Sequence, residues 1–330
     1  MTLHLCQAGY EAFLIKELGG VVEKSGPGWV LGPDGSGDLC FAHLSLKAPA
    51  AVEGKSLNAL AGAMADCFTS STQNERFEGP WTFCVESAGD TGLSRRAKTA
   101  AEECLAIVKG RMSRVAKLAV QGRPGRGPAR GFFAYLTTFD RAYVARDAVA
   151  GGQRRMADDP QAPSRSYLKV EEAYGLMGRE PAAGETVADL GAAPGGWSYS
   201  AAKRGAFVVA VDNGPLKGGA IHAGITHKAE DAFKFAVQTP VDWLYCDMVE
   251  DPDRITGLLG QWLDCGWCRR FIVNLKFGRR DPLRVLARVE TLRSKCSLLR
   301  ARHLFHDREE LTLVGERRLE REGPGGYTRA

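Results

Sequence analysis

The sequence contains no apolar run long enough to cross a membrane. No stretch approaches the ~20 consecutive apolar residues that a transmembrane helix requires. Its first residues, Met1 to Tyr10, also lack the basic start and apolar centre of a secretory signal peptide. We therefore expect a cytoplasmic protein with no membrane partner, and nothing in the sequence indicates an obligatory protein partner.

A cysteine framework is missing as well. The nine cysteines are scattered through 330 residues, and the only C-x-x-C motif is Cys265-Gly-Trp-Cys268. A zinc site would need a second such pair or nearby histidines, and the sequence offers neither within reach. We expect reduced thiols, as in a cytosol, and no bound metal.

Basic residues are scarce at the start of the chain and abundant just after it. Residues 1–94 hold 5 Lys/Arg and 11 Asp/Glu, residues 95–155 hold 14 and 4, and residues 156–330 hold 25 and 24. A basic segment of this kind is typical of a surface that binds a polyanion. Basic residues interleaved with aromatic ones favour RNA, although a core position fits the rings themselves better. The aromatic residues are Phe132, Phe133, Tyr135 and Tyr143. The alternative is a solvated basic helix.

The sequence predicts three units. Residues 1–75 form a small α+β unit, and residues 76–150 form a second unit with a long basic helix from Leu93 to Leu118 and a strand hairpin. Residues 151–161 are a linker, and the third unit occupies residues 162–330.

The third unit is predicted to be an α/β domain with a largely parallel sheet, because helical segments separate most of its strands. The expected strands are Thr186–Leu190, Phe207–Val211, Trp243–Asp247, Phe271–Lys276, Ala301–Phe305 and Leu311–Val314. The last two strands are only five residues apart. That connection is too short for a crossover, so the last strand must be antiparallel.

A turn of small residues follows the first of these strands. It runs from Gly191 to Gly196 and leads into an expected helix from Trp197 to Arg204. Small residues let a ligand approach the backbone closely. The spacing differs from the G-x-G-x-x-G fingerprint of dinucleotide sites, so it favours an adenosine ligand without phosphates over a nicotinamide-dependent dehydrogenase.

Four charged residues fall at the strand ends where ligands gather in such sheets: Asp212, Asp247, Lys276 and Glu310. Asp212 is the expected partner of a ribose diol; the alternative is a helix N-cap before Pro215. A lysine in a pocket can lose its proton and act as a general base toward an alcohol. The alternative is that each lysine forms a simple surface salt bridge.

Five motifs resemble, in order, those of the FtsJ-like ribose 2′-O-methyltransferases, which use S-adenosyl-L-methionine. They are Ser164–Glu172, Asp189–Ser198, Cys246–Met248, Asn274–Lys276 and Arg308–Leu313. The resemblance implies a Rossmann-like methyltransferase fold and a catalytic Lys-Asp-Lys-Glu tetrad. Matched residue by residue, the tetrad is Lys169, Asp247, Lys276 and Glu310, with Lys276 as the general base.

Further motifs resemble those of the bacterial enzymes that methylate a cytidine ribose of 23S rRNA. They are Asp158–Ser166, Val211–Pro215, Asp231–Phe235, Cys246–Glu250, Gln261–Leu263 with Gly266–Cys268, and His306–Glu310. This narrower resemblance implies a ferredoxin-like subdomain over residues 1–75, a THUMP RNA-binding domain over residues 76–150, and 23S rRNA as the substrate. The implied cofactor contacts are Ser166, Ala193, Pro194, Gly195, Gly196, Asp212, Asp231 and Asp247. Some relatives have cysteine where this chain has Ala193. Two alternatives stay open, namely 2′-O-methylation of another RNA such as tRNA, and a non-catalytic RNA-binding protein of ribosome assembly.

Overall fold

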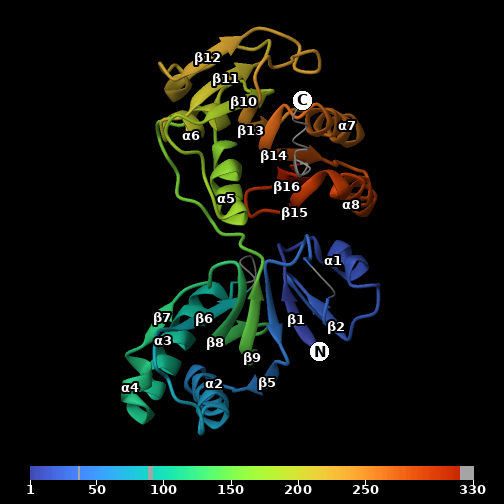
Figure 1. The fold of residues 1–330 in the computed structure, drawn as a ribbon. Coiled ribbons are helices and arrows are strands. Elements are labelled where there is room, and N and C mark those ends of the chain that lie inside the picture. Colours follow the sequence, from blue (N-terminus) through green and yellow to red (C-terminus); the bar gives the residue numbers. More distant parts are fainter. Residues whose placement is uncertain (36–37, 88–91, 320–330) are drawn as a thin grey trace, which may run out of the picture. The chain divides into compact units, whose positions relative to one another are not determined.

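The computed structural model describes residues 1–35, 38–87 and 92–319. The chain divides into two compact units, Met1–Gln153 and Arg154–Ala330, each of which is described by itself (Figure 1). Within the described residues, none of the helices combines the length and the apolar character that crossing a bilayer requires.

The N-terminal unit is built on one sheet with the strand order β2-β3-β1-β4-β9-β8-β6-β7, and β5 also pairs with β9. Its strands are β1 (Thr2–Leu5), β2 (Lys24–Gly26), β3 (Trp29–Gly32), β4 (Leu44–Lys47), β5 (Ala50–Glu53), β6 (Trp81–Ser87), β7 (Ala119–Gln121), β8 (Gly127–Leu136) and β9 (Arg141–Ala150). Its helices are α1 (Glu11–Glu17), α2 (Leu57–Ser71), α3 (Ser94–Arg111) and α4 (Ser113–Ala116). Because β4 pairs with β9, the predicted first and second units share this sheet, and the boundary between them stays a prediction.

The sheet of this unit is buried on both faces at β8. Phe132 packs in a cluster with α2 and α3, whereas its neighbour Phe133 packs with Leu3 and Leu5 on the opposite face. Successive side chains of a strand point to opposite faces, so both rings belong to cores. The interpretation of these rings as core residues is therefore confirmed.

The long basic helix ends earlier than predicted. Its axis breaks at Met112, whose backbone angles (φ −137°, ψ 59°) are not helical. Beyond the break, the Trp81 indole N–H donates to the Val115 carbonyl at 2.8 Å, and the Trp81 backbone N–H donates to Leu118. These bonds to β6 turn the segment into the short α4 and then β7, so the expectation of one helix to Leu118 was wrong.

The C-terminal unit has a second sheet with the order β12-β11-β10-β13-β14-β16-β15. Its strands are β10 (Thr186–Leu190), β11 (Phe207–Val211), β12 (Ile225–Lys228), β13 (Val241–Cys246), β14 (Cys268–Lys276), β15 (Cys296–Arg302) and β16 (Glu310–Arg317). Its helices are α5 (Tyr167–Met177), α6 (Gly196–Ala202), η2 (Gly218–Ala220), α7 (Pro252–Asp264), α8 (Pro282–Glu290) and η3 (Arg293–Lys295). The strands run parallel except β16, which is antiparallel to both neighbours. The predicted Rossmann-like α/β fold with an antiparallel last strand is confirmed.

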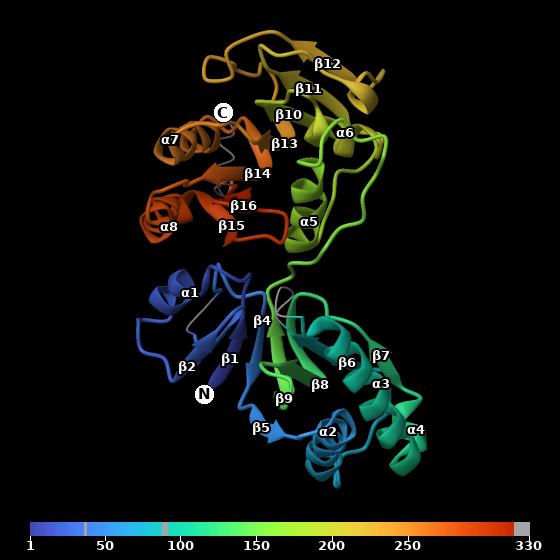
Figure 2. The same cartoon turned by 180° about the vertical axis from the view of Figure 1, so that it is seen from behind.

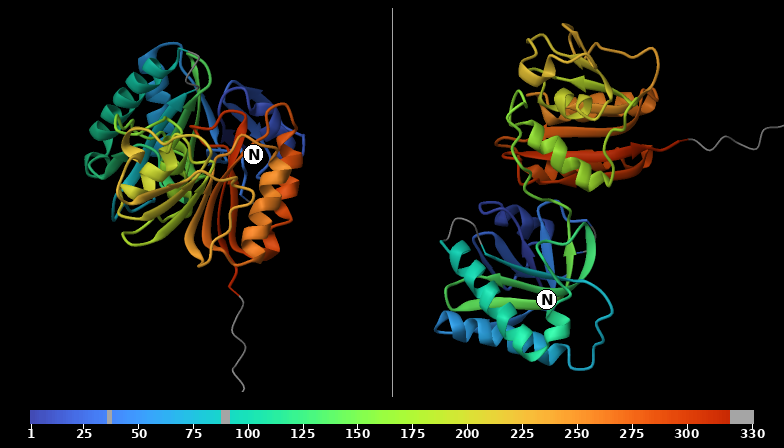
Figure 3. Two further views of the ribbon diagram at one scale, coloured as in Figure 1. Left: turned by 90° about the horizontal axis from the view of Figure 1, so that it is seen from above. Right: turned by 90° about the vertical axis from the view of Figure 1, so that its left-hand side faces the viewer.

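Helices cover both faces of this sheet. Helices α5 and α6 lie together on one face, and α7 and α8 lie together on the other (Figures 1 and 2); Figure 3 shows the same layers from two further sides. Asp251 and Asp281 cap α7 and α8, and each is followed by proline at the first helical position. Both residues are typical of helix starts.

Two strands differ from expectation. Strand β12 was not predicted, because Ile225–Lys228 is largely exposed and carries no apolar periodicity. Strand β15 lies earlier than the predicted Ala301–Phe305, because the Leu304 N–H donates to the Asp307 carboxylate at 3.0 Å and turns the chain out of the sheet.

We expect that any side chain larger than hydrogen at Gly315 in β16 destabilises the protein. A Cβ at this position would lie 2.3 Å from Phe271 Cζ and 2.4 Å from the Leu298 carbonyl oxygen. Gly315→Ala should therefore lower the free energy of unfolding by roughly 1–3 kcal/mol through overpacking. Gly257→Ala is the matched control, because it lies inside α7 with open space around it and should add roughly 0.5–1 kcal/mol. Denaturant titration of both variants decides, and equal effects would contradict the packing argument.

Candidate active site

The candidate site includes the turn between β10 and α6, residues 191–196. Gly191 and Gly195 have positive φ angles of 74° and 107°, which L-residues with side chains rarely adopt. A Cβ on Gly191 would come within 2.4 Å of Met248 Cγ, and one on Gly195 within 2.2 Å of Ala220 Cβ. The turn therefore needs glycine for its conformation and for close packing against the neighbouring loops.

Asp212 follows β11 and is fixed by the backbone beside this turn. Its Oδ2 accepts the Ala193 N–H at 3.0 Å, and its Oδ1 accepts the Gly214 N–H at 2.7 Å. Each carboxylate oxygen retains acceptor capacity for a further donor. The next helical turn, η2, begins only at Gly218, so the alternative of Asp212 as a helix cap is wrong.

Ser166 lies against the other side of the turn. Its hydroxyl is 2.7 Å from the Ser164 hydroxyl, and its carbonyl accepts the Trp197 indole N–H at 2.9 Å. A Cβ on Gly196 would lie 2.9 Å from Ser166 Oγ. The structure thus brings Ser166 next to the turn that holds Ala193, Pro194, Gly195 and Gly196.

Asp231 is placed differently. It is exposed, accepts the Phe233 N–H at 3.0 Å and lies 3.7 Å from Lys234. Within the part of the chain that the structure describes, no hydrogen bond or ion pair joins it to the other predicted cofactor residues. Its role stays a prediction.

The four predicted catalytic residues meet at the carboxyl edge of the sheet. Lys169 comes from α5, Asp247 follows β13, Lys276 ends β14, and Glu310 begins β16 directly opposite Lys276 in the pairing register. Lys169 Nζ lies 2.7 Å from Glu310 Oε1 and 3.6 Å from Asp247 Oδ1. Lys276 Nζ donates to Asp247 Oδ1 at 2.7 Å and to the Asp247 carbonyl at 2.8 Å. Two cations and two carboxylates therefore form one network, which we call the charged cluster.

The two lysines of the charged cluster are not equivalent. Burial acts to lower the pKa of Lys169, but Asp247 and Glu310 outweigh it and hold that pKa above its ordinary value. Lys169 is therefore a fixed positive charge at neutral pH. Lys276 is more open, with 24% of its side chain exposed against 11% for Lys169, and both of its partners belong to Asp247.

The sequence analysis assigned no role to two further carboxylic acids near the charged cluster, Asp189 and Asp307. Burial raises the pKa of Asp189, inside β10, to about 7, and Asp189 accepts the Ser198 hydroxyl at 2.6 Å. Burial also raises the pKa of Asp307 well above its ordinary value, and Asp307 accepts the Asn274 amide and the Thr312 hydroxyl, both at 3.2 Å. An acid within an otherwise apolar strand was the signal available for Asp189.

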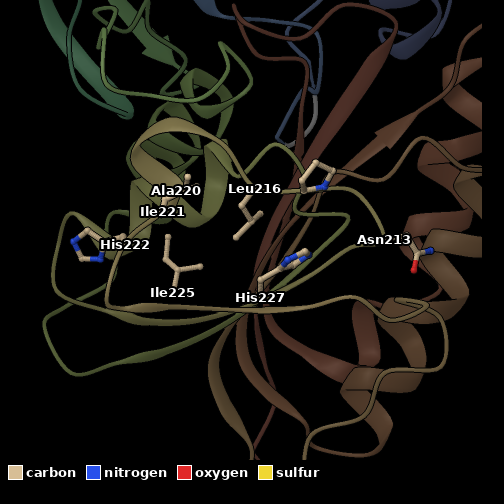
Figure 4. Close-up of a pocket in the computed structure, with 8 residues that line it drawn as sticks. Asn213, Leu216, Ala220, Ile221, His222, Ile225 and His227 are labelled. Atoms are coloured by element: carbon tan, nitrogen blue, oxygen red, sulfur yellow. The ribbon is translucent and has the colours of Figure 1, made fainter.

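A pocket of about 480 Å³ lies beyond the Asp212 corner. It is lined by Asn213, Pro215, Leu216, Ala220, Ile221, His222, Ile225 and His227. Leu216, Ile225 and His227 lie around its centre (Figure 4), and the His227 Nε2 is 2.9 Å from the Asp212 carbonyl oxygen. The pocket includes none of the predicted site residues, so it neighbours the corner without forming it.

The cysteines form no metal site in the described part of the chain, where no three His, Cys, Asp or Glu side chains are grouped suitably. Cys265 is exposed at the end of α7, while Cys268 is buried at the start of β14, where burial raises the pKa of its thiol to about 12.

The sheet order, the antiparallel last strand and the corner beside β10 define the C-terminal unit as an α/β domain of the methyltransferase class. Residues 162–259 match the family described as FtsJ-like methyltransferase, and this confirms the predicted resemblance for the C-terminal unit.

The curated relatives that this chain resembles include two proteins of the same name. The ribosomal RNA large subunit methyltransferase M of Halorhodospira halophila is 42% identical over 184 residues, which are 54% of this chain and 54% of that protein. The protein of the same name from Actinobacillus pleuropneumoniae serotype 3 is 44% identical over 182 residues, 49% of each chain. The chain spans about half the length of the curated relatives it matches.

Among solved structures, the fibrillarin pre-rRNA processing protein of Methanococcus jannaschii aligns with 60% of this chain and 86% of its own, at 15% identity and a TM-score of 0.37.

Asp189 predicts a pH-dependent stability. Its pKa is about 7 in the folded protein, against about 3.9 in an unfolded chain. Between these values the folded state binds a proton that the unfolded state has released, so this group lowers stability as pH rises from about 4 to 7. Asp189→Asn keeps an acceptor for Ser198 and removes the titration. Its stability relative to the wild type should rise by up to about 4 kcal/mol between pH 4 and pH 8. A pH-independent difference in urea unfolding would contradict this prediction.

Proposed function

We propose that this chain is an S-adenosyl-L-methionine-dependent RNA methyltransferase that modifies a ribose 2′-hydroxyl, in 23S rRNA and most specifically at a cytidine, in the cytoplasm. The observation that carries the proposal is the charged cluster of Lys169, Asp247, Lys276 and Glu310 beside the glycine turn. The name of the curated relatives, ribosomal RNA large subunit methyltransferase M, supports ribosomal RNA as the substrate.

The residues around the turn fit the proposed cofactor. Asp212 is held by two backbone amides with acceptor capacity left over, as recognition of a ribose diol requires. We assign the methionine end to Ser166 and to the turn of Ala193, Pro194, Gly195 and Gly196. Asp231 is assigned to the adenine amine, and Asp247 to the border between cofactor and lysines. When bound, S-adenosyl-L-methionine supplies a methyl group that its positively charged sulfur already activates.

Lys276 is the proposed general base. A neutral lysine amine has two N–H donors and one lone pair. Its two partners, Oδ1 and the carbonyl of Asp247, would occupy both donors and leave the lone pair available. In the proposed step, the Lys276 lone pair would take the proton from the ribose 2′-hydroxyl as that oxygen accepts the methyl group, and the electron pair of the broken carbon–sulfur bond would stay on the sulfur. Base assistance of this kind typically contributes ~10²–10⁴-fold.

The other members of the charged cluster orient the base and the acceptor. Lys169 keeps its proton because Asp247 and Glu310 raise its pKa, so it cannot share the role of base. Its positive charge next to Asp247 favours negative charge developing on the ribose oxygen. Asp247 and Glu310 fix the two lysines at hydrogen-bonding distance.

The N-terminal unit is the proposed RNA-binding part, with a ferredoxin-like subdomain at residues 1–75 and a THUMP domain at residues 76–150. The basic segment 95–155 is partly neutralised, because several of its arginines pair with carboxylates. These arginines are Arg111, Arg123, Arg130, Arg141 and Arg146. The exposed cations that remain on α3, α4 and the two loops after α4 are Arg95, Lys98, Lys109, Arg114, Lys117 and Arg126. We therefore place the RNA surface on α3 and α4.

Asp212 should be required for cofactor affinity. Asp212→Ala removes the proposed ribose acceptor and leaves the donors of Ala193 and Gly214 without their partner. Affinity for S-adenosyl-L-methionine should fall by roughly 1–3 kcal/mol. Calorimetry measures this affinity directly. Asp242→Ala is the matched control, because Asp242 lies near the N-terminal end of β13, at the edge of the sheet opposite Asp212. Unchanged affinity in Asp212→Ala would remove this residue from the cofactor site.

Lys276 should be required for turnover but not for cofactor binding. Lys276→Ala and Lys276→Arg should both lose at least ~10²-fold in kcat, because arginine keeps the charge yet cannot act as a base at neutral pH. Lys169→Arg is the control that preserves a positioning charge, and it should retain more activity than Lys276→Arg. Full activity in Lys276→Arg would show that charge alone suffices.

The acceptor atom and the RNA are tested together. Methylated riboses in total RNA, mapped with and without the gene, should differ at a position in 23S rRNA that resists alkaline cleavage, because alkali cleaves RNA through the free 2′-oxygen. A substrate with deoxyribose at that position should accept no methyl group. A difference confined to tRNA would correct the substrate, and methylation of the deoxy substrate would overturn the ribose assignment.

A further inference from the structure

Glu172 is a fully buried carboxylate beside the charged cluster. It lies three residues after Lys169 on α5, which places both residues on one face of the helix. Its Oε1 accepts the backbone N–H groups of Arg154 at 3.0 Å and Phe305 at 3.1 Å, and its Oε2 accepts that of His306 at 3.3 Å. Burial of a carboxylate is costly unless donors satisfy it, and these three amides do so.

The first segment that Glu172 holds is the start of the C-terminal unit, Arg154–Ala157. Two further bonds fix this segment: the Met156 N–H donates to His306 Nε2 at 2.9 Å, and the Tyr167 hydroxyl donates to the Ala157 carbonyl at 2.9 Å. Burial and the nearby Arg155 and Arg165 lower the pKa of His306, which keeps its ring neutral and able to accept. The segment that joins the two units along the chain is therefore bonded to α5 and to the loop after β15.

The second segment is that loop, and it leads to Glu310. Its turn is closed by the bond from the Leu304 N–H to the Asp307 carboxylate. The Glu309 carbonyl accepts the Phe277 N–H at 3.0 Å, and the Arg308 N–H lies 3.3 Å from Glu310 Oε1. The loop thus sets the position of the carboxylate that holds Lys169 at 2.7 Å.

These contacts form a closed circuit. Helix α5 carries both Lys169 and Glu172. Lys169 pairs with Glu310 at the end of the loop after β15, and Glu172 accepts the N–H groups of Phe305 and His306 near the start of that loop. We propose that Glu172 is a positioning residue that fixes Glu310 against Lys169 and ties the segment Arg154–Ala157 to the same loop. This inference rests on the proposed function, because it assigns Glu172 to the geometry of that reaction.

The circuit couples two properties of the enzyme. A displacement of Arg154–Ala157 passes through Glu172 and His306 to the loop that presents Glu310. RNA held by the N-terminal unit therefore acts on the charged cluster through this segment, while the cofactor corner at Gly191–Gly196 and Asp212 lies outside the circuit.

Two substitutions separate the two arms in the full-length protein. Glu172→Gln keeps the size of the side chain but replaces one carboxylate oxygen with an N–H₂ group, so in either orientation of the amide at least one N–H of the loop, that of Phe305 or that of His306, loses its acceptor. His306→Phe removes only the acceptor of the Met156 N–H and keeps the bonds to Glu172. His306→Gln is its matched control, because an amide oxygen can still accept that N–H.

Glu172→Gln should lose at least tenfold in kcat while its affinity for S-adenosyl-L-methionine stays unchanged. Hydrogen exchange should accelerate in residues 154–157 and 304–309 but not in residues 186–202. His306→Phe should raise the KM for RNA at least threefold with kcat unchanged at saturating RNA, and His306→Gln should behave as the wild type.

A folded Glu172→Gln with wild-type kcat, or with unchanged exchange in residues 304–309, would overturn the proposal. Should Glu172→Gln not fold, the His306 pair decides, and equal KM values for RNA in His306→Phe and His306→Gln would overturn it. The exchange measurement needs no substrate, so it tests the circuit separately from the proposed function. If the wild type transfers no methyl group to any RNA, the proposed function fails whatever the exchange shows.

Discussion

The antiparallel pairing of β16 with β14 is the constraint on which the candidate active site depends. In a purely parallel sheet, the first residue of the last strand would lie at the edge opposite the ligand. Because β16 runs backward, its first residue, Glu310, is paired with Lys276, the last residue of β14. A single strand reversal therefore adds a carboxylate to an edge where β13 and β14 already place Asp247 and Lys276. Helix α5 completes the charged cluster by supplying Lys169.

Much of this arrangement follows from the sequence because a parallel sheet aligns its strand ends. The short connection before β16 dictated its direction, and the strand ends then located Asp212, Asp247, Lys276 and Glu310 at one edge. Lys169 lies on a helix, whose placement no strand pattern determines, so only the family resemblance identified it. The roles of Ser166 and Asp231 also came from the resemblance, whereas the turn of small residues after β10 favoured an adenosine ligand by its own spacing.

The remaining features depend on contacts that have no local signal. Trp81 ends the basic helix through bonds to residues more than thirty positions away. Strand β12 is too polar to show a pattern, and Asp307 ends β15 before the predicted Phe305 by bonding the backbone of Leu304. Glu172 likewise accepts the backbone N–H groups of Arg154, Phe305 and His306, which any residue type except proline supplies. Sequence patterns report burial and periodicity, whereas these features arise from tertiary hydrogen bonds.

The polarity of β12 has a consequence for self-association of the protein. This strand is at the end of the second sheet, so among the residues that the structure describes, one side of its backbone has no neighbouring strand in that sheet. Edges of this kind can recruit strands from other chains and begin aggregation. The edge here is four residues long, and His227 and Lys228 on it are exposed. A short, solvated and partly charged edge is a poor template for intermolecular pairing, so the feature that hid β12 from sequence analysis also limits growth of the sheet.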